Sequence, residues 1–102
     1  MGAPKRRVRL HPEADRDLAA GRDFYGESSL EAAERFLLEV DAALALIQEA
    51  PERWAIYRLG MRRFVMSSFP YSIVYRPAAS MIDVYAVAHA KRRPLYWHNR
   101  KF

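Results

Sequence analysis

The stretch YSIVYRPAASMIDVYAVAH, residues 71–89, decides the fold of this 102-residue chain. Residues 71–76 and 81–89 are rich in β-branched and aromatic side chains, and the turn-forming residues 77–80 separate them. This pattern predicts an antiparallel β-hairpin. Alternation along its second strand defines two faces. The face expected to meet helices holds Ile82, Val84, Ala86 and Ala88, and the other holds Asp83, Tyr85, Val87 and His89.

Two more strands are predicted upstream of this hairpin. Residues 61–67, MRRFVMS, have the same strand-like composition, and Phe69-Pro70 marks a turn before residue 71. Residues 7–10, RVRL, alternate in polarity, which indicates a short strand with one buried face. The last three strands are expected to pair antiparallel in succession.

Two amphipathic helices are predicted between the first strand and the others. Pro12 suits the first position of a helix, because its missing N–H would be unpaired there. Ser28 and Glu31 fit a reciprocal capping box that starts the second helix, and Pro51 ends it. The apolar positions at helical spacing are Ala14, Leu18, Gly21 and Tyr25 in the first helix, and Ala33, Phe36, Leu37, Val40, Leu44 and Ile47 in the second.

The order β-α-α-β-β-β predicts an α/β (α+β) fold with two layers. The interval between the helices is so short that they must form an antiparallel hairpin, which buries its apolar stripes on the sheet. We therefore expect one domain over residues 1–102: a helix hairpin on a mainly antiparallel four-stranded sheet, followed by a basic C-terminal tail. There are no internal repeats and no low-complexity segments.

Composition excludes several classes of protein. The absence of cysteine excludes disulfides, thiolate zinc sites and a cysteine nucleophile, and we expect no metal and no cofactor. No apolar run approaches the roughly 18 residues of a membrane span. The basic residues 1–10 are followed by HPEADRD, which is not the apolar core of a signal peptide. We expect a cytoplasmic protein that does not bind membranes.

Charge is divided unequally between the two halves of the chain. Residues 1–52 hold seven Lys/Arg and eleven Asp/Glu, whereas residues 53–102 hold ten Lys/Arg and a single acid, Asp83. This segregation indicates a polyanionic partner for the second half, either nucleic acid or an acidic protein. The alternative interpretation is a solvated basic surface that keeps the protein soluble.

The segment AVAHAKRRPLYWHNRKF, residues 86–102, concentrates the candidate functional side chains. Three adjacent cations, residues 91–93, repel one another unless an anionic partner binds them. Tyr96 and Trp97 fit either anchors that pin the tail to the sheet or platforms for base stacking. His89, at a strand end, fits either a hydrogen-bonded anchor or a group that titrates during catalysis.

Three motifs together resemble the RelE/ParE superfamily of toxins from bacterial type II toxin–antitoxin systems. They are LHPEADRDL at residues 10–18, FPYSIVYR at 69–76 and AVAHAKRRPLYW at 86–97. The resemblance covers nearly the whole chain and is closest to the ParE-like plasmid-stabilisation branch. It implies a toxin whose positively charged, concave sheet face is covered by a segment of a cognate acidic antitoxin, in a toxin–antitoxin hetero-oligomer.

The superfamily divides by target, and the fold alone does not choose between its branches. RelE-like members cut messenger RNA on the ribosome, using Lys and Arg on the middle strands and a Tyr near the C-terminus. ParE-like members inhibit DNA gyrase without a catalytic step. Here no lysine lies between Lys5 and Lys91, so the lysine pair of RelE-like sites is missing. Gyrase inhibition is favoured, a ribosome-dependent endoribonuclease is the alternative, and a non-toxic nucleic-acid-binding domain is a further one.

The candidate site residues follow from this comparison. Arg62 and Arg63 are neighbours on one strand and face opposite ways, so at most one of them lines a site. For a RelE-like activity the catalytic candidates are His89, Arg62, Arg63 and Tyr96. The candidates for binding the target or antitoxin are Arg62, Arg63, Lys91, Arg92, Arg93, Tyr96 and Trp97.

Overall fold

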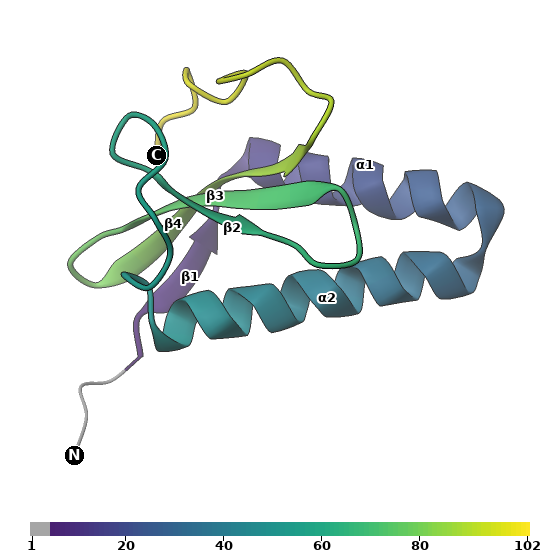
Figure 1. Ribbon diagram of the computed structural model, residues 1–102, viewed down its shortest axis with the longest axis horizontal. Helices are drawn as coiled ribbons and strands as arrows, with labels where there is room; N and C mark the ends of the chain where they lie inside the picture. Colours follow the sequence, from purple (N-terminus) through teal and green to yellow (C-terminus); the bar gives the residue numbers. More distant parts are fainter. Residues whose placement is uncertain (1–4) are drawn as a thin grey trace.

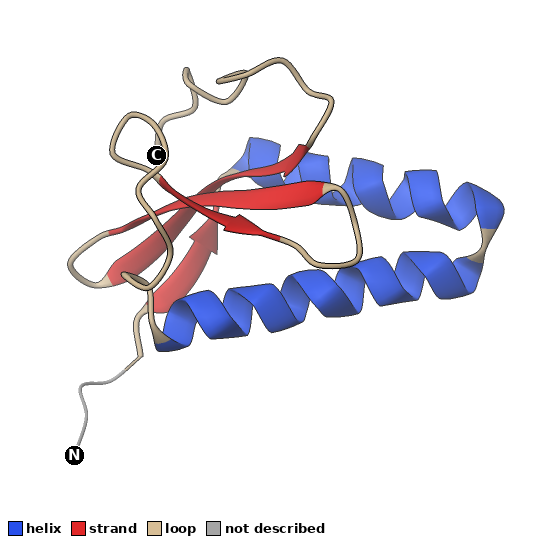
Figure 2. Cartoon of the chain, in the orientation of Figure 1, coloured by secondary structure: helices blue, strands red, loops and turns tan. Residues whose placement is uncertain are grey.

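The structure, a computed structural model, describes residues 5–102 (Figure 1). Residues 1–4, which the sequence analysis assigned to the basic start of the same domain, lie outside the described residues. The observed elements are β1 (Arg7–Leu10), α1 (Pro12–Ser28), α2 (Leu30–Glu49), β2 (Arg62–Val65), β3 (Tyr71–Pro77) and β4 (Met81–His89). The predicted order of strands and helices and the α+β class are confirmed (Figure 2).

The four strands form one mixed sheet in the order β1-β4-β3-β2. β4 pairs parallel with β1, where Val8 lies opposite Ile82, and antiparallel with β3. The two helices between β1 and the later strands supply the long connection that a parallel pair needs. As a result β4 lies inside the sheet, between β1 and β3.

The helices form an antiparallel pair, with Ser29 alone between them (Figure 1). The Ser29 N–H donates to the Tyr25 carbonyl at 3.0 Å, and the Ser29 Oγ accepts from the Ala32 N–H at 3.2 Å. The predicted capping box at Ser28 is therefore wrong by one residue, because α1 continues through Ser28 and the extended backbone occurs at Ser29. At the other end of α1, the His11 Nδ1 accepts from the Glu13 N–H at 3.0 Å and caps the helix.

The main core lies between the helices and the sheet. Phe36, Val40 and Ile47 of α2 are fully buried there against Ile73 and Ile82 of the sheet. Burial of side chains this large contributes about 1.5–3 kcal/mol each relative to exposure, so the predicted stripe on α2 contributes much of the free energy that holds the layers together. Among the described residues, no helix is both long enough and apolar enough to cross a membrane.

A β-bulge changes the faces of β4 halfway along the strand. Tyr75 lies opposite Val84, but Val74 lies opposite Ala86, so Tyr85 is an extra residue without a partner on β3. A single inserted residue reverses the alternation of side chains beyond it, because a strand has a period of two.

The predicted faces of β4 are therefore wrong after the bulge. Val87, predicted to face away from the helices, packs in the main core. Ala86 and Ala88, predicted to meet the helices, lie instead in a second cluster on the opposite face of the sheet. His89, the last residue of β4, packs its ring against Tyr71 of the main core and also borders the cavity described below.

The second cluster lies under the tail, residues 90–102. Trp97 is 3% exposed and packs there against Val74 and Ala86 of the sheet and Met61 before β2. The tail has no regular secondary structure, so the apolar contacts of Trp97 are a main reason that it stays on the sheet. We call the face of the sheet that carries this cluster the outer face.

Candidate functional site

A cavity of about 130 Å³ opens on the outer face, between β2, the ends of β3 and β4, and the tail. Its charged and aromatic lining residues are Tyr57, Arg63, His89, Arg92, Arg93, Tyr96 and Trp97. Six of the residues that the sequence singled out thus gather around one cavity. Arg62 and Lys91 are not part of its lining.

The two arginines of β2 have different surroundings. The Arg63 guanidinium lies 4.2 Å from the ring centroid of Tyr57, at the cavity wall. Arg62 donates from Nη1 to the carbonyls of Glu52 at 3.2 Å and Trp54 at 2.7 Å. Arg62 therefore fastens the connection after α2, and only Arg63 is in position to meet a ligand in the cavity.

Residues 91–93 form an exposed basic turn directly after β4. Arg92 stacks on Tyr96, with its guanidinium 3.9 Å from the ring centroid, and Arg93 lines the cavity beside it. Within residues 5–102, none of these three cations forms an ion pair with an acid, and Arg63 forms none either. Stacking on aromatic rings fixes a guanidinium while leaving its N–H edge open to a carboxylate or phosphate.

His89 is held by two contacts at the end of β4. Its ring packs edge-on against Tyr71 at a centroid distance of 4.9 Å, and its Nδ1 accepts a hydrogen bond from the Lys91 N–H at 3.0 Å. The hydrogen bond shapes the turn that carries the basic residues. This geometry gives His89 the surroundings of a structural anchor.

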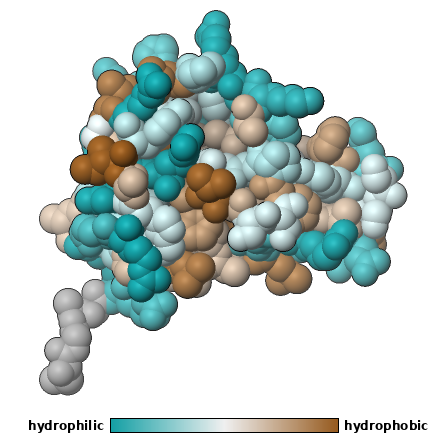
Figure 3. All heavy atoms as spheres, in the orientation of Figure 1, coloured by the Kyte–Doolittle hydropathy of each residue, from teal (hydrophilic) through white to brown (hydrophobic). Residues whose placement is uncertain are grey.

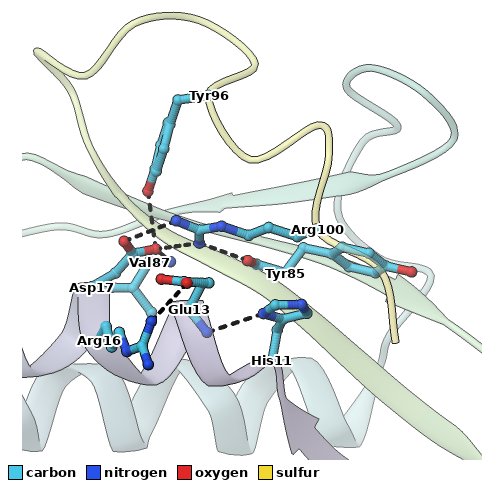
Figure 4. Close-up of polar contacts among 8 residues, drawn as sticks. All are labelled: His11, Glu13, Arg16, Asp17, Tyr85, Val87, Tyr96 and Arg100. Atoms are coloured by element: carbon cyan, nitrogen blue, oxygen red, sulfur yellow. Dashed lines mark hydrogen bonds and ion pairs between the residues drawn. The ribbon is translucent and has the colours of Figure 1, made fainter.

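Tyr96 is similarly engaged, with Asp17 of α1 as its partner (Figure 4). The Tyr96 hydroxyl donates to the Asp17 Oδ2 at 3.0 Å. Burial, together with the negative charge of Asp17, raises the pKa of Tyr96 well above its ordinary value. A phenol in this state is a poor proton donor at neutral pH.

Asp17 and Arg100, which the sequence analysis did not single out, form the centre of this arrangement (Figure 4). The Asp17 carboxylate accepts from Arg100 at 2.6 and 3.2 Å and from the Val87 N–H at 3.1 Å. Burial alone would lower the pKa of Arg100, but the hydrogen bonds and charge of Asp17 raise it overall. Only a weak signal in the sequence pointed to a buried role for Asp17, namely its place next to Leu18 at the border of the apolar stripe of α1.

These contacts also satisfy backbone hydrogen-bonding groups at an open edge of the sheet. β1 ends where Leu10 lies opposite Val84, so beyond this point no strand of the described residues pairs with β4 on that side. There the Asp17 carboxylate accepts a hydrogen bond from the Val87 N–H, and Arg100 donates to the Tyr85 carbonyl at 2.9 Å. Because an exposed strand edge invites wrong pairing, this covering protects the sheet as well as fixing the tail.

The chemistry available at the cavity is anion binding. Arg63, Arg92 and Arg93 converge on it without acidic partners among the described residues. General base and acid groups are less available, since the His89 Nδ1 and the Tyr96 hydroxyl are both hydrogen bonded. Within residues 5–102 no three His, Asp or Glu side chains are grouped to hold a metal ion.

Comparison with known structures and sequences agrees with this architecture. A solved structure described as the chromosomal ParDE TA system from P. aeruginosa has the same fold, with a TM-score of 0.77 at 16% identity over 85% of this chain and 98% of that one. Toxin ParE2 of Mycobacterium tuberculosis is 30% identical over 90 residues, which are 87% of this chain and 86% of the relative. Toxin RelE2 of Caulobacter vibrioides is 34% identical over 76 residues, covering 74% and 85%.

The fold and these relatives define a toxin of the RelE/ParE superfamily. The sequence model of one family, described as ParE toxin of type II toxin-antitoxin system, parDE, matches residues 8–94. The chain belongs to this ParE toxin family, so it is a toxin of a type II toxin–antitoxin system. The resemblance inferred from the three sequence motifs is confirmed.

Proposed function

We propose that this protein is a cytoplasmic, growth-inhibiting toxin that inhibits DNA gyrase by binding, without a catalytic step of its own. The observation that carries the proposal is the state of the would-be catalytic groups. His89 is engaged by Lys91 and Tyr71, and the Tyr96 hydroxyl is engaged by Asp17. Cleavage at a ribose 2′-hydroxyl requires a base and an acid that are free to exchange protons with the substrate.

The cations support the same proposal. Arg63, Arg92 and Arg93 offer charge for binding an anionic surface, but Arg62 is committed to backbone carbonyls. No lysine lies between Lys5 and Lys91 to complete a RelE-like set. A cavity rich in guanidinium groups and poor in free proton donors and acceptors suits recognition better than acid–base chemistry.

Neutralisation is the second half of the proposal. A cognate acidic antitoxin would form a hetero-oligomer with the toxin and cover its basic half, in which ten Lys/Arg face one acid. The solved relative is described as a ParDE TA system, which supports a pairing of this kind. Opposite charges would speed the encounter of the two proteins, while apolar contacts would supply most of the affinity.

The test expresses the chain in bacteria and then assays the purified protein. Induction should arrest growth with filamentation, and co-expression of the acidic antitoxin should restore growth. The purified toxin should inhibit supercoiling by gyrase and leave messenger RNA on translating ribosomes intact. Normal growth with soluble, folded protein would refute the toxin assignment in this chain.

A ribosome-dependent endoribonuclease is the second candidate. It is favoured by the similarity to toxin RelE2 of Caulobacter vibrioides and by the position of His89 at the cavity. Cleavage of ribosome-bound RNA in phase with codons, lost in His89→Gln and Tyr96→Phe variants, would reverse the ranking.

A further inference from the structure

One tight turn on the surface breaks a local sequence rule. Leu59 and Gly60 both have positive φ, 54° and 75°, and the Met61 N–H donates to the Arg58 carbonyl at 2.9 Å across them. Two central residues with positive φ are the signature of a type I′ hairpin turn, which prefers Asn, Asp or Gly at the first of them. A leucine in this left-handed conformation is strained, because its Cβ crowds the following carbonyl.

The tail repeats this feature next to the turn. Among residues 5–102, Leu59 and Leu95, with φ of 61°, are the only residues other than glycine with positive φ. Both line one shallow hollow of about 330 Å³, whose other lining residues are Arg93, Pro94 and His98. Strained residues persist where the surrounding structure enforces them, and they cluster at binding sites.

The two leucines differ in burial: Leu95 is half-buried and packs against the second cluster, whereas the exposure of Leu59 gives the chain no stabilising burial in return for its strain. Leu59 is 63% exposed, and it is not a member of either apolar cluster. Apolar residues are scattered over the face in view in Figure 3, and single ones need no explanation. Leu59 differs from them because a polar residue in its place would relieve strain as well as exposure.

The charges around the hollow define the chemistry of a partner. Arg93 is part of its lining, and the exposed Arg58 is the neighbour of Leu59. Asp83 is the only acid among residues 53–102, and it is 5% exposed and paired with Arg9 at 2.9 Å. The two charged residues placed at the hollow, Arg58 and Arg93, are therefore both cationic, and no acid of residues 53–102 is free to offset them. A partner that fits presents a projecting apolar side chain within an acidic surface.

We propose that Leu59, Pro94 and Leu95 form the anchoring surface for the protein target of the toxin, on an acidic face of DNA gyrase. This inference rests on the proposed function. The hollow is built by one four-residue turn and one turn of the tail, so it accepts a single side chain of a folded partner. An extended or helical antitoxin segment needs a longer groove, and we assign the hollow to the target on this ground.

The decisive variant is Leu59→Asn, because asparagine suits the turn that leucine strains. Its melting temperature should equal or exceed that of the parent, and its affinity for purified antitoxin should stay within about twofold. Its inhibition of gyrase supercoiling should weaken by about tenfold or more, as for loss of a binding hot spot. Growth arrest on expression should weaken in parallel. Leu95→Asn should weaken gyrase inhibition and growth arrest likewise, but its melting temperature should fall, because Leu95 also packs against the second cluster.

Leu38→Gln is the matched control. Leu38 is 66% exposed on α2, in an ordinary helical position, and glutamine is a good helix former. This variant should arrest growth and inhibit gyrase as the parent does. If it loses activity as far as Leu59→Asn does, general loss of exposed apolar area explains the effect, and the assignment of the hollow is wrong.

The outcomes separate this inference from the proposed function. Full activity of Leu59→Asn and Leu95→Asn against gyrase and in cells would overturn the anchoring surface alone. A parent protein that arrests growth without inhibiting gyrase would overturn the gyrase assignment, and the comparison of growth arrest would still decide whether the hollow binds the target. Weakened binding of antitoxin, with target inhibition unchanged, would show that the hollow belongs to the antitoxin and would refute the inference.

Discussion

Replacing Asp17 by asparagine should destabilise the protein more than any other single change of charge. The Asp17 side chain is 7% exposed and that of Arg100 is 12% exposed, so the variant leaves a guanidinium buried without its counter-charge. Breaking a buried ion pair by removing one partner costs about 3–5 kcal/mol. Because asparagine keeps the shape and one acceptor oxygen, we expect a loss near the lower end, about 3 kcal/mol.

Equilibrium unfolding in urea, followed by circular dichroism, measures this loss as a lower midpoint. The melting temperature should fall by about 4–8 °C for each kcal/mol of lost stability in a protein of this size. The tail should also become accessible before the rest of the chain unfolds, which limited proteolysis near Trp97 would detect. Asp23→Asn on the same helix is the control: its pair with Arg22 at 3.1 Å is exposed, so the loss should stay below about 1 kcal/mol.

A double variant isolates the ion pair. If Asp17→Asn is costly because Arg100 is left buried and unpaired, replacing Arg100 by methionine in the same chain should recover part of the loss. Asp17→Asn within about 1 kcal/mol of the parent would refute this reasoning. So would a double variant whose loss is the plain sum of the two single losses.

Three further predictions follow from the core, the buried tyrosines and the basic tail. Phe36→Ala should lower the free energy of unfolding by about 3–5 kcal/mol in urea titrations, since this side chain is fully buried in the main core. Burial raises the pKa of Tyr75 from 10.0 to about 12, so the contribution of this residue to the free energy of unfolding is complete below pH 10 and should be lost as the pH rises towards 12. Tyr75→Phe should flatten this decline in unfolding curves recorded across that range. Reversal of residues 91–93 to glutamate should slow antitoxin association and flatten its salt dependence in stopped-flow measurements, whereas reversal at Glu34 and Asp41, on the helices, should leave both unchanged.

Elements with a strong local signal were predictable from the sequence. The stripe on α2 and the alternation in β1 each depend on residues close together in the chain, and both agree with the structure. The bulge at Tyr85 was not predictable in this way. An inserted residue leaves the composition of a strand unchanged, and only pairing with β3 reveals that Ala86 and Ala88 have changed faces.

The candidate site likewise has residues whose role could be predicted from the sequence and residues whose role could not. The basic turn at residues 91–93 and the packing of Trp97 could be inferred from residue types alone. The contact of Asp17 with Arg100 could not, because it joins residues 83 positions apart whose meeting depends on where β1 ends beside β4. Considered by itself in the sequence, each of these two residues is typical of an ordinary surface charge.

The position of β4 inside the sheet has a consequence for synthesis of the protein. The pairing of β1 with β4 joins Arg7 to Met81, so the sheet cannot close until nearly the whole chain has left the ribosome. The helix hairpin depends on local contacts and forms early, but its apolar stripe has no lasting cover until then. Chains released before residue 81 should therefore lack both the complete sheet and the outer-face cavity, so a cell that aborts translation of this chain should produce no fragment that carries the binding site.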